Sequence, residues 1–169
     1  MYRKNKIVVL AHCLLNVNSK VSGLALYEGV HRKLVLPYIE AGAGIIQLPC
    51  PEMSFIGPLR WGMSKNQYDT ISYRNHCREI LTPVVEQMQE YSKNGCVIET
   101  IVGVDGSPSC GINYYSNGYS GGMVEQIQEQ KNMLHEAPGQ GVFMEEFSKL
   151  LAEKGLRIGF QAISEKEQL

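Results

Sequence analysis

The chain has 169 residues, and its 16 lysines and arginines against 17 aspartates and glutamates give a formal net charge of -1. A chain of this length buries enough apolar surface for one domain, which we expect to extend over residues 1–169. The near-neutral charge provides no basic surface for nucleic acid or an anionic membrane, so we expect neither as a partner. A small neutral molecule is the expected ligand.

The amino-terminal segment, MYRKNKIVVLAHCLL, places basic residues before an apolar run, as a secretory signal peptide does. His12 and Asn16 interrupt the run early and no small-residue cleavage site follows, so the pattern favours a first β-strand. No stretch approaches the roughly 20 apolar residues that a membrane-spanning helix needs. We therefore expect a soluble, cytoplasmic protein.

The elements predicted along the chain alternate between strands and helices. Apolar, β-branched runs predict strands, and apolar residues spaced three or four apart predict helices. In chain order these are a strand at 6–11, a helix at 31–41, a strand at 44–48, a helix at 68–93, a strand at 97–104, a helix at 141–155 and a strand at 156–163. This alternation predicts an α/β fold, with an open, mostly parallel sheet and helices on both of its faces.

Three features interrupt the regular pattern. Pro83 lies inside the second predicted helix, where its ring removes a backbone donor and is able to kink or break the helix. Residues 16–30 and residues 54–66 lack clear periodicity, and each stretch follows a cysteine. Long irregular loops in a compact domain are more often functional than idle, so we expect both stretches to cover a site.

The chain has five cysteines at irregular spacing, Cys13, Cys50, Cys77, Cys96 and Cys110. An odd number in a chain of this size favours reduced thiols or metal ligands over a disulfide framework. Cys13, Cys50 and Cys110 each lie just beyond the carboxyl end of a predicted strand, and these ends share the edge where open α/β sheets bind ligands. We expect these three thiols to converge, and Cys77 and Cys96 to be small buried hydrophobic residues.

Three thiolates without an evident fourth protein ligand restrict the kind of metal site. Structural zinc normally has four protein ligands, whereas an iron-sulfur cluster held by three cysteines leaves one iron free to act as a Lewis acid. Zinc with His12 as the fourth ligand remains an alternative. Against it, His12 adjoins Cys13 at a strand end, where neighbouring side chains point in opposite directions.

The loop VDGSPSCG at residues 104–111 surrounds the last of these cysteines. Its glycines permit tight backbone turns close to an inorganic cluster, and its proline stiffens the loop. Ser107 and Ser109 are able to donate hydrogen bonds to sulfide or to a substrate. An ordinary surface turn would explain the glycines and the proline but not the cysteine.

Short motifs around the same three cysteines resemble those of a known family, DUF523, which includes the thiouracil desulfidases. The motifs are CLL at 13–15, CPE at 50–52 and SPSCG at 107–111, followed by Gly118, Tyr119, Gly121 and Gly122. The resemblance implies a 4Fe-4S cluster held by Cys13, Cys50 and Cys110. It also implies that the free iron takes the sulfur of a thiolated nucleobase, after which water replaces sulfur on carbon.

Two segments depart from the pattern of this family. After CLL, the family usually has an Arg-Tyr-Asp-Gly stretch, where this chain has NVNSKVSGLA without an arginine. After CPE, the usual Gly-Gly-Leu-Pro and arginine are replaced by MSFIGPLRWG. The chain thus resembles a divergent member, with the cysteines retained and different substrate-contacting loops.

Replacing C=S by C=O requires a group that polarises sulfur, a water molecule and a general base within hydrogen-bond reach of that water. Glu52, two residues after Cys50, is the first candidate for the base, and Asp105 is the second. Ser107 and Ser109 are candidate positioning groups. Glu52 could instead only cap a loop or helix start, and Asp105 could only hydrogen-bond its own turn.

Two other classes of function remain open from the sequence. In the first, Cys110 is the nucleophile of a hydrolase or amidotransferase and is activated by His12, His76 or His135. In the second, the protein carries a metal or cluster without catalysing a reaction. Iron and sulfide content would separate the hydrolase from the other two classes, and turnover would separate an enzyme from a carrier.

Overall fold

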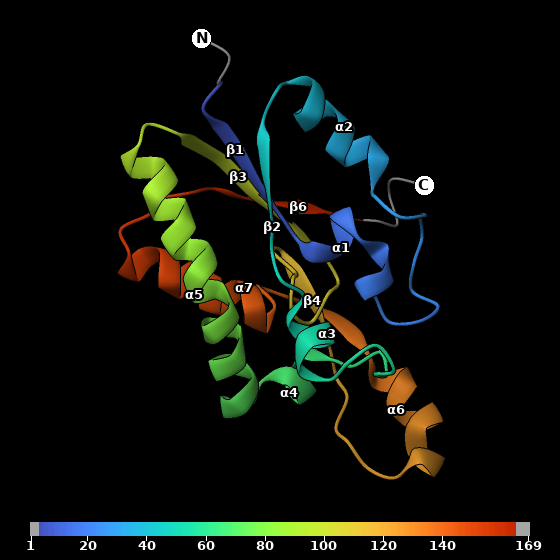
Figure 1. The fold of residues 1–169 in the computed structure, drawn as a ribbon. Coiled ribbons are helices and arrows are strands. Elements are labelled where there is room, and N and C mark those ends of the chain that lie inside the picture. The colour runs from blue at the N-terminus through green and yellow to red at the C-terminus, as the bar shows by residue number, and fades with distance from the viewer. Residues whose placement is uncertain (1–3, 165–169) are drawn as a thin grey trace.

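Four parallel strands form the central sheet, in the order β2-β1-β3-β6 (Figure 1). The computed structural model describes residues 4–164 of the chain. The strands of this sheet are β1 (Lys6–Leu10), β2 (Gly44–Gln47), β3 (Val97–Val104) and β6 (Phe160–Ile163). β1 pairs with both β2 and β3, and β3 pairs with β6, each in parallel. The predicted open, parallel sheet is confirmed.

Helices cover both faces of the sheet, as the alternating pattern predicts. They are α2 (Arg32–Glu40), α5 (Ile71–Lys93) and α7 (Val142–Glu153). In Figure 1, α5 and α7 lie on one face and α2 on the other. Because side chains alternate along a strand, Ile7 and Val9 pack in the core with α5 and α7, whereas Val8 and Leu10 pack in the core with α2.

Some predicted boundaries were wrong by a few residues. α5 begins at Ile71 rather than at residue 68 because Thr70 caps it, with its side chain accepting a hydrogen bond from the Tyr73 amide. Pro83 lies inside α5 without ending it. Residues 156–159, predicted as the start of the last strand, precede β6 instead.

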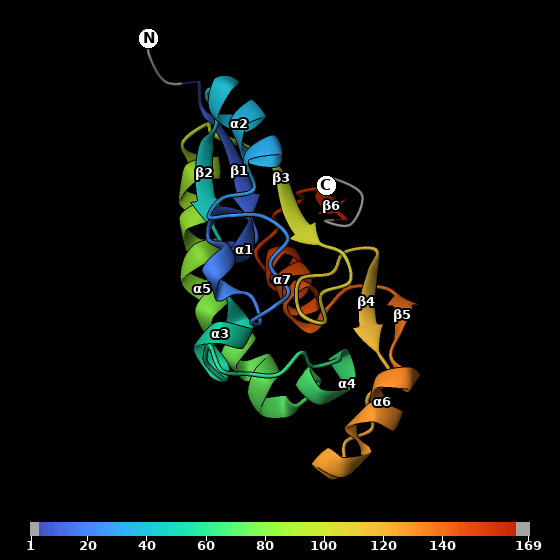
Figure 2. The same ribbon diagram turned by 90° about the vertical axis from the view of Figure 1, so that its right-hand side faces the viewer.

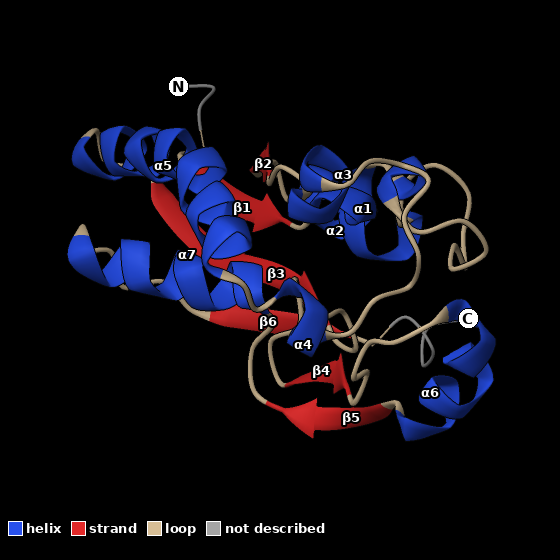
Figure 3. Ribbon diagram, turned by 90° about the horizontal axis from the view of Figure 1, so that it is seen from below, coloured by secondary structure: helices blue, strands red, loops and turns tan. Residues whose placement is uncertain are grey.

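Several short elements have no counterpart among the predicted ones, because segments of three to seven residues are too short to show a period. They are α1 (His12–Leu15), η1 (Val17–Ser19), α3 (Pro51–Phe55), α4 (Lys65–Tyr68), β4 (Tyr114–Asn117), η2 (Val124–Gln126), α6 (Ile127–Met133) and β5 (His135–Pro138). β4 and β5 pair in antiparallel fashion as a separate ribbon, which Figure 3 shows beside the main sheet.

These short elements gather at one end of the molecule. Figure 2 shows α1, α3, α4 and the β4–β5 ribbon beyond the carboxyl ends of β1 and β3. The two faces of the sheet therefore form the core with the long helices. The loops and short helices at the carboxyl ends of the strands are left to form a site. Within residues 4–164, no helix combines the length and the apolarity that crossing a membrane would require.

Candidate active site

The strand order places the three cysteines of the predicted site at the same end of the sheet. β2 and β3 pair with β1 on opposite sides, so the strand order reverses at β1. Open α/β sheets bind ligands at the carboxyl ends of the strands beside such a switch point. Cys13 lies in α1 directly after β1, Cys50 is the N-cap of α3 after β2, and Cys110 lies in the loop after β3. All three cysteines therefore follow the carboxyl ends of their strands at one edge of the sheet.

The irregular stretch before α2 lies against two of these cysteines. The Cys50 sulfur accepts a hydrogen bond from the Met53 amide at 3.5 Å, and its thiol lies 4.0 Å from the carbonyl oxygen of Ser19. The Tyr27 hydroxyl donates to the carbonyl oxygen of Cys13 at 2.9 Å. The contacts place this stretch next to the cysteines, consistent with the prediction that it covers a site.

Side chains within the loop after β3 set the position of Cys110. Ser107 Oγ accepts a hydrogen bond from the Cys110 amide at 3.0 Å. Asp105 Oδ1 accepts from the amides of Ile112 and Asn113 at 2.9 and 2.8 Å, and Oδ2 accepts from the Asn113 side chain at 2.9 Å. Asp105 therefore makes the turn-holding hydrogen bonds that an aspartate before a glycine commonly makes.

The three thiols interact electrostatically. Burial raises the pKa of Cys110 well above its usual value, and the neighbouring thiols of Cys13 and Cys50 raise it further. Burial also raises the pKa of Cys50. Because three thiolates at this place would repel one another, a bound metal centre would have to offset their charge and displace their protons.

The donor atoms of the three cysteines are soft, and thiolates of this kind suit either zinc or an iron-sulfur cluster. Within residues 4–164, no group of three or more His, Cys, Asp or Glu side chains is already arranged to hold a metal ion. His12 Nδ1 hydrogen-bonds with the carbonyl oxygen of Leu48 at 3.0 Å, so one of its ring nitrogens already has a structural partner.

Glu52 forms a nearly buried ion pair with Arg60. Arg60 Nε donates to Glu52 Oε2 at 3.0 Å, and the side chains of the arginine and the glutamate are 2% and 12% exposed. The same guanidinium donates to the carbonyl oxygens of Ser19 at 2.7 Å and Gly57 at 3.2 Å. The arginine thereby connects the two irregular stretches and orients Glu52. Sequence periodicity does not indicate Arg60, because a contact between loops has no period.

Two buried tyrosines lie beside this ion pair. The Tyr73 hydroxyl and Ser109 Oγ are 2.8 Å apart, and both residues are buried. The Tyr68 and Tyr73 rings pack with centroids 4.7 Å apart. Burial raises the pKa of each tyrosine, and the negative charge of Glu52 raises both further. Both hydroxyls therefore stay protonated.

The histidines proposed as activators of Cys110 have other partners. His76 Nε2 hydrogen-bonds with Ser54 Oγ at 2.8 Å, and His135 Nδ1 with the carbonyl oxygen of Met133 at 3.0 Å. Among the described residues, neither ring nor that of the α1 histidine hydrogen-bonds with Cys110. The geometry offers no base for the alternative in which this thiol is a nucleophile.

The two remaining cysteines belong to the core between the sheet and its helices, Cys77 as a residue of α5 and Cys96 packed at the edge of the same core. Cys77 is fully buried, and burial raises its pKa to about 12, so it stays a neutral thiol. It also adds a small effect to the raised pKa of Cys110. Cys96 is half-buried just before β3, at the opposite end of that strand from the site. Both therefore pack as apolar residues.

The fold and the site together define an α/β protein with three cysteines at the switch point of a parallel sheet. Residues 5–133 match the family described as "Putative 2-thiouracil desulfurase", and the chain belongs to this family. The resemblance inferred from the cysteine motifs is confirmed.

Two individual proteins are similar to this chain. The uncharacterized protein MJ0003 of Methanocaldococcus jannaschii is 38% identical over 107 residues, which are 63% of this chain and 68% of that protein. The solved structure of a [4Fe-4S]-dependent thiouracil desulfidase, TudS, matches with a TM-score of 0.51 and 17% identity, over 97% of this chain and 93% of that one. At this identity the second similarity shows a shared fold.

Proposed function

We propose that the protein is a desulfidase, which hydrolyses a small thiocarbonyl compound and releases its sulfur as sulfide. A 4Fe-4S cluster held by Cys13, Cys50 and Cys110 is the proposed cofactor. The observation that carries this proposal is the position of the three cysteines, which follow β1, β2 and β3 at the same end of the parallel sheet, beside its switch point. Family membership and the cluster dependence of the structural neighbour support it.

The reaction exchanges C=S and water for C=O and hydrogen sulfide, and it needs no oxidant or reductant. When bound, the cluster supplies an iron without a protein ligand, which is thiophilic and acts as a Lewis acid toward sulfur. Glu52 is the proposed base that takes a proton from the attacking water. Its pairing with Arg60 through Oε2 leaves the other oxygen, Oε1, without a hydrogen bond from the described residues.

The serines of the proposed site have positioning roles. Ser107 accepts hydrogen bonds from the amides of Ser109 and Cys110 at 3.3 and 3.0 Å, and so orients the thiol. Ser109 is fixed by Tyr73. Asp105 is the reserve candidate for the base, but its two oxygens already accept three hydrogen bonds from its own loop. We therefore place it among the positioning groups.

The proposal is tested by rebuilding the cluster without oxygen and measuring sulfide release. We expect the wild-type protein to bind iron and sulfide and to release sulfide from at least one thiolated pyrimidine, purine or thioamide. Replacing Cys13, Cys50 or Cys110 by serine should abolish the visible absorption of the cluster and the activity, because each removes one of three protein ligands.

Cys96→Ser is the matched control, because this thiol lies away from the site and the variant should keep the cluster. Equal loss of absorption in all four variants would mean that unfolding, not ligation, explains the result. An intact cluster without sulfide release from any of these compounds would contradict the desulfidase and favour a cluster carrier.

A further inference from the structure

The hydroxyl of Tyr68 is a buried polar group without a well-formed hydrogen bond. Tyr68 is 1% exposed, and among the described residues its hydroxyl is the one buried side-chain nitrogen or oxygen that makes no hydrogen bond. Leaving such a group unsatisfied costs about 1–3 kcal/mol of stability. A phenylalanine would fill the same space without this cost, so the hydroxyl has no structural explanation.

The surroundings of this hydroxyl point to Glu52. Tyr68 ends α4 and packs its ring against Tyr73, whose own ring contacts Phe55 of α3, with centroids 5.3 Å apart. Glu52 lies in the first turn of α3. Glu52 and Arg60 both act on the Tyr68 hydroxyl, through their charges and at hydrogen-bonding range, so the hydroxyl lies next to their ion pair although neither contact has the geometry of a full hydrogen bond.

The two groups have complementary hydrogen-bonding capacity. A carboxylate has about four acceptor sites, and Glu52 uses one of them for Arg60. A nearly buried carboxylate needs further donors. The Tyr68 hydroxyl is a donor that lacks an acceptor, so a small rotation of either side chain would satisfy both.

We propose that Tyr68 is a positioning residue for Glu52, to which it donates a hydrogen bond during the reaction. The inference rests on the proposed function, because it adds a second hydrogen bond that orients Glu52 as the base. Arg60 holds one carboxylate oxygen, and Tyr68 donates to a further acceptor site of the same carboxylate. The remaining acceptor sites are then directed at the attacking water, and orientation of this kind contributes to rate rather than to binding.

Tyr68→Phe in the cluster-loaded enzyme tests this role. We expect kcat to fall about tenfold or more, while KM stays within about twofold and the cluster absorption is unchanged. The melting temperature of the cluster-free protein should not fall, because the lost hydroxyl made no hydrogen bond. Tyr73→Phe is the matched control, since it breaks the contact with Ser109 and should lower that melting temperature.

A second measurement asks whether Tyr68 acts through Glu52. In the Glu52→Gln background, Tyr68→Phe should change the residual rate by less than about twofold, because residues that act as a unit are not additive. An unchanged kcat in the single variant, or an undiminished effect in the Glu52→Gln background, would overturn the positioning role alone. A wild-type enzyme that keeps its cluster but releases no sulfide would overturn the proposed function together with this inference.

Discussion

Two carboxylates near the cysteines illustrate how contacts decide the role of a residue. Asp105 accepts three hydrogen bonds from its own loop, which occupy both of its oxygens. Glu52 accepts one, from Arg60, and lies two residues after Cys50. A base must have an oxygen free to receive the proton of water, so the geometry favours Glu52 over Asp105.

At the residue scale, we predict that Glu52→Gln slows sulfide release on the order of 100-fold or more, because an amide cannot accept the proton of water. The cluster absorption and the affinity for substrate should be retained, since glutamine keeps the shape of the side chain. Anaerobic turnover assays on the loaded enzyme measure the effect. Asp105→Asn is the control, and a larger loss of turnover in Asp105→Asn than in Glu52→Gln would reverse the assignment.

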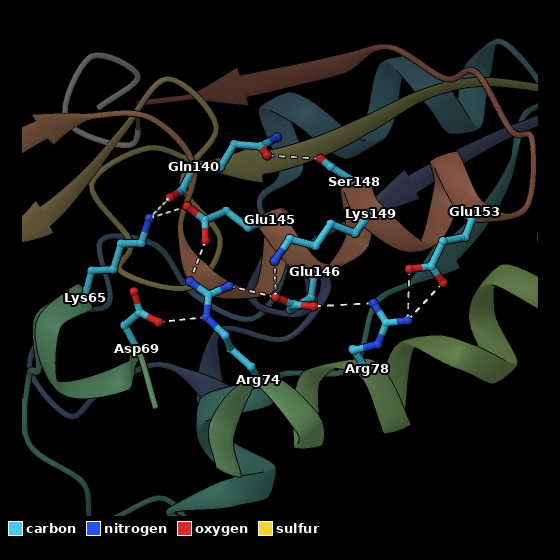
Figure 4. Close-up of polar contacts among 10 residues, drawn as sticks. All are labelled: Lys65, Asp69, Arg74, Arg78, Gln140, Glu145, Glu146, Ser148, Lys149 and Glu153. Atoms are coloured by element: carbon cyan, nitrogen blue, oxygen red, sulfur yellow. Dashed lines mark hydrogen bonds and ion pairs between the residues drawn. The ribbon is translucent and has the colours of Figure 1, made fainter. Parts of the chain in front are cut away.

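At the scale of elements, ion pairs fasten α5 to α7 along one side of the molecule (Figure 4). Arg74 of α5 donates to Glu145 and Glu146 of α7, each at 2.7 Å. Arg78, one turn further along α5, lies 3.5 Å from Glu146 and 2.9 Å from Glu153. Glu146 is the centre of this network because it pairs with both arginines and with Lys149. Its side chain is only 4% exposed. The network keeps α5 and α7 in register over the sheet face.

The network predicts a loss of stability in acid. Burial alone would raise the pKa of Glu146, but hydrogen bonds from Lys149 and Arg74 outweigh it and lower the pKa. The folded state therefore binds fewer protons than the unfolded state around pH 4.5, the ordinary pKa of a glutamate. The stabilisation is present above that pH and is lost as the pH falls through the lowered pKa.

Denaturant unfolding at neutral pH and at a series of acidic pH values below 4.5 checks this prediction. We expect Glu146→Gln to reduce the free energy of unfolding by about 1–3 kcal/mol at neutral pH, and this difference should shrink as the pH falls below 4.5 and through the lowered pKa of the wild-type carboxylate, which is then protonated. Glu153→Gln is the control, because this carboxylate is 52% exposed and should change stability little at either pH. A pH-independent effect of Glu146→Gln would contradict the role of its charge.

At the scale of the whole molecule, the site depends on close packing between β3 and the loop that carries Cys110. A side-chain carbon added at Gly103 of β3 would overlap the carbonyl oxygen of Cys110 and would lie 2.6 Å from Ile112 Cγ1. The loop folds back on its own strand only because this residue lacks a side chain. The position of the loop that carries Cys110 therefore depends on close packing against Gly103 of the core strand.

We predict that Gly103→Ala lowers the free energy of unfolding by about 1–3 kcal/mol and reduces the iron bound per chain, because the loop must move away from the strand. Gly159→Ala is the matched control, since nothing lies within 4 Å of a carbon added there. Denaturant unfolding and iron analysis after anaerobic reconstitution measure both effects. Equal iron content in the two variants would contradict this dependence.

The long elements of the fold are predictable because their signals are local. After Lys6 the residues of β1 are continuously apolar, and this pattern predicts a strand buried on both faces, as observed for Ile7 to Leu10. α3 and α4 have only five and four residues, so neither shows a period. β4 and β5 are separated by α6 and do not form a tight hairpin, so no turn signal precedes their pairing.

The sequence by itself determined the α/β class, the parallel sheet and the family, because apolar periodicity and short cysteine motifs are contiguous along the chain. It also indicated Glu52 through its place beside Cys50. Only the tertiary structure decided which groups surround that carboxylate. Arg60 pairs with it from a loop and Tyr68 lies near it at the end of α4, and such neighbours come together when distant segments pack, which no local pattern encodes.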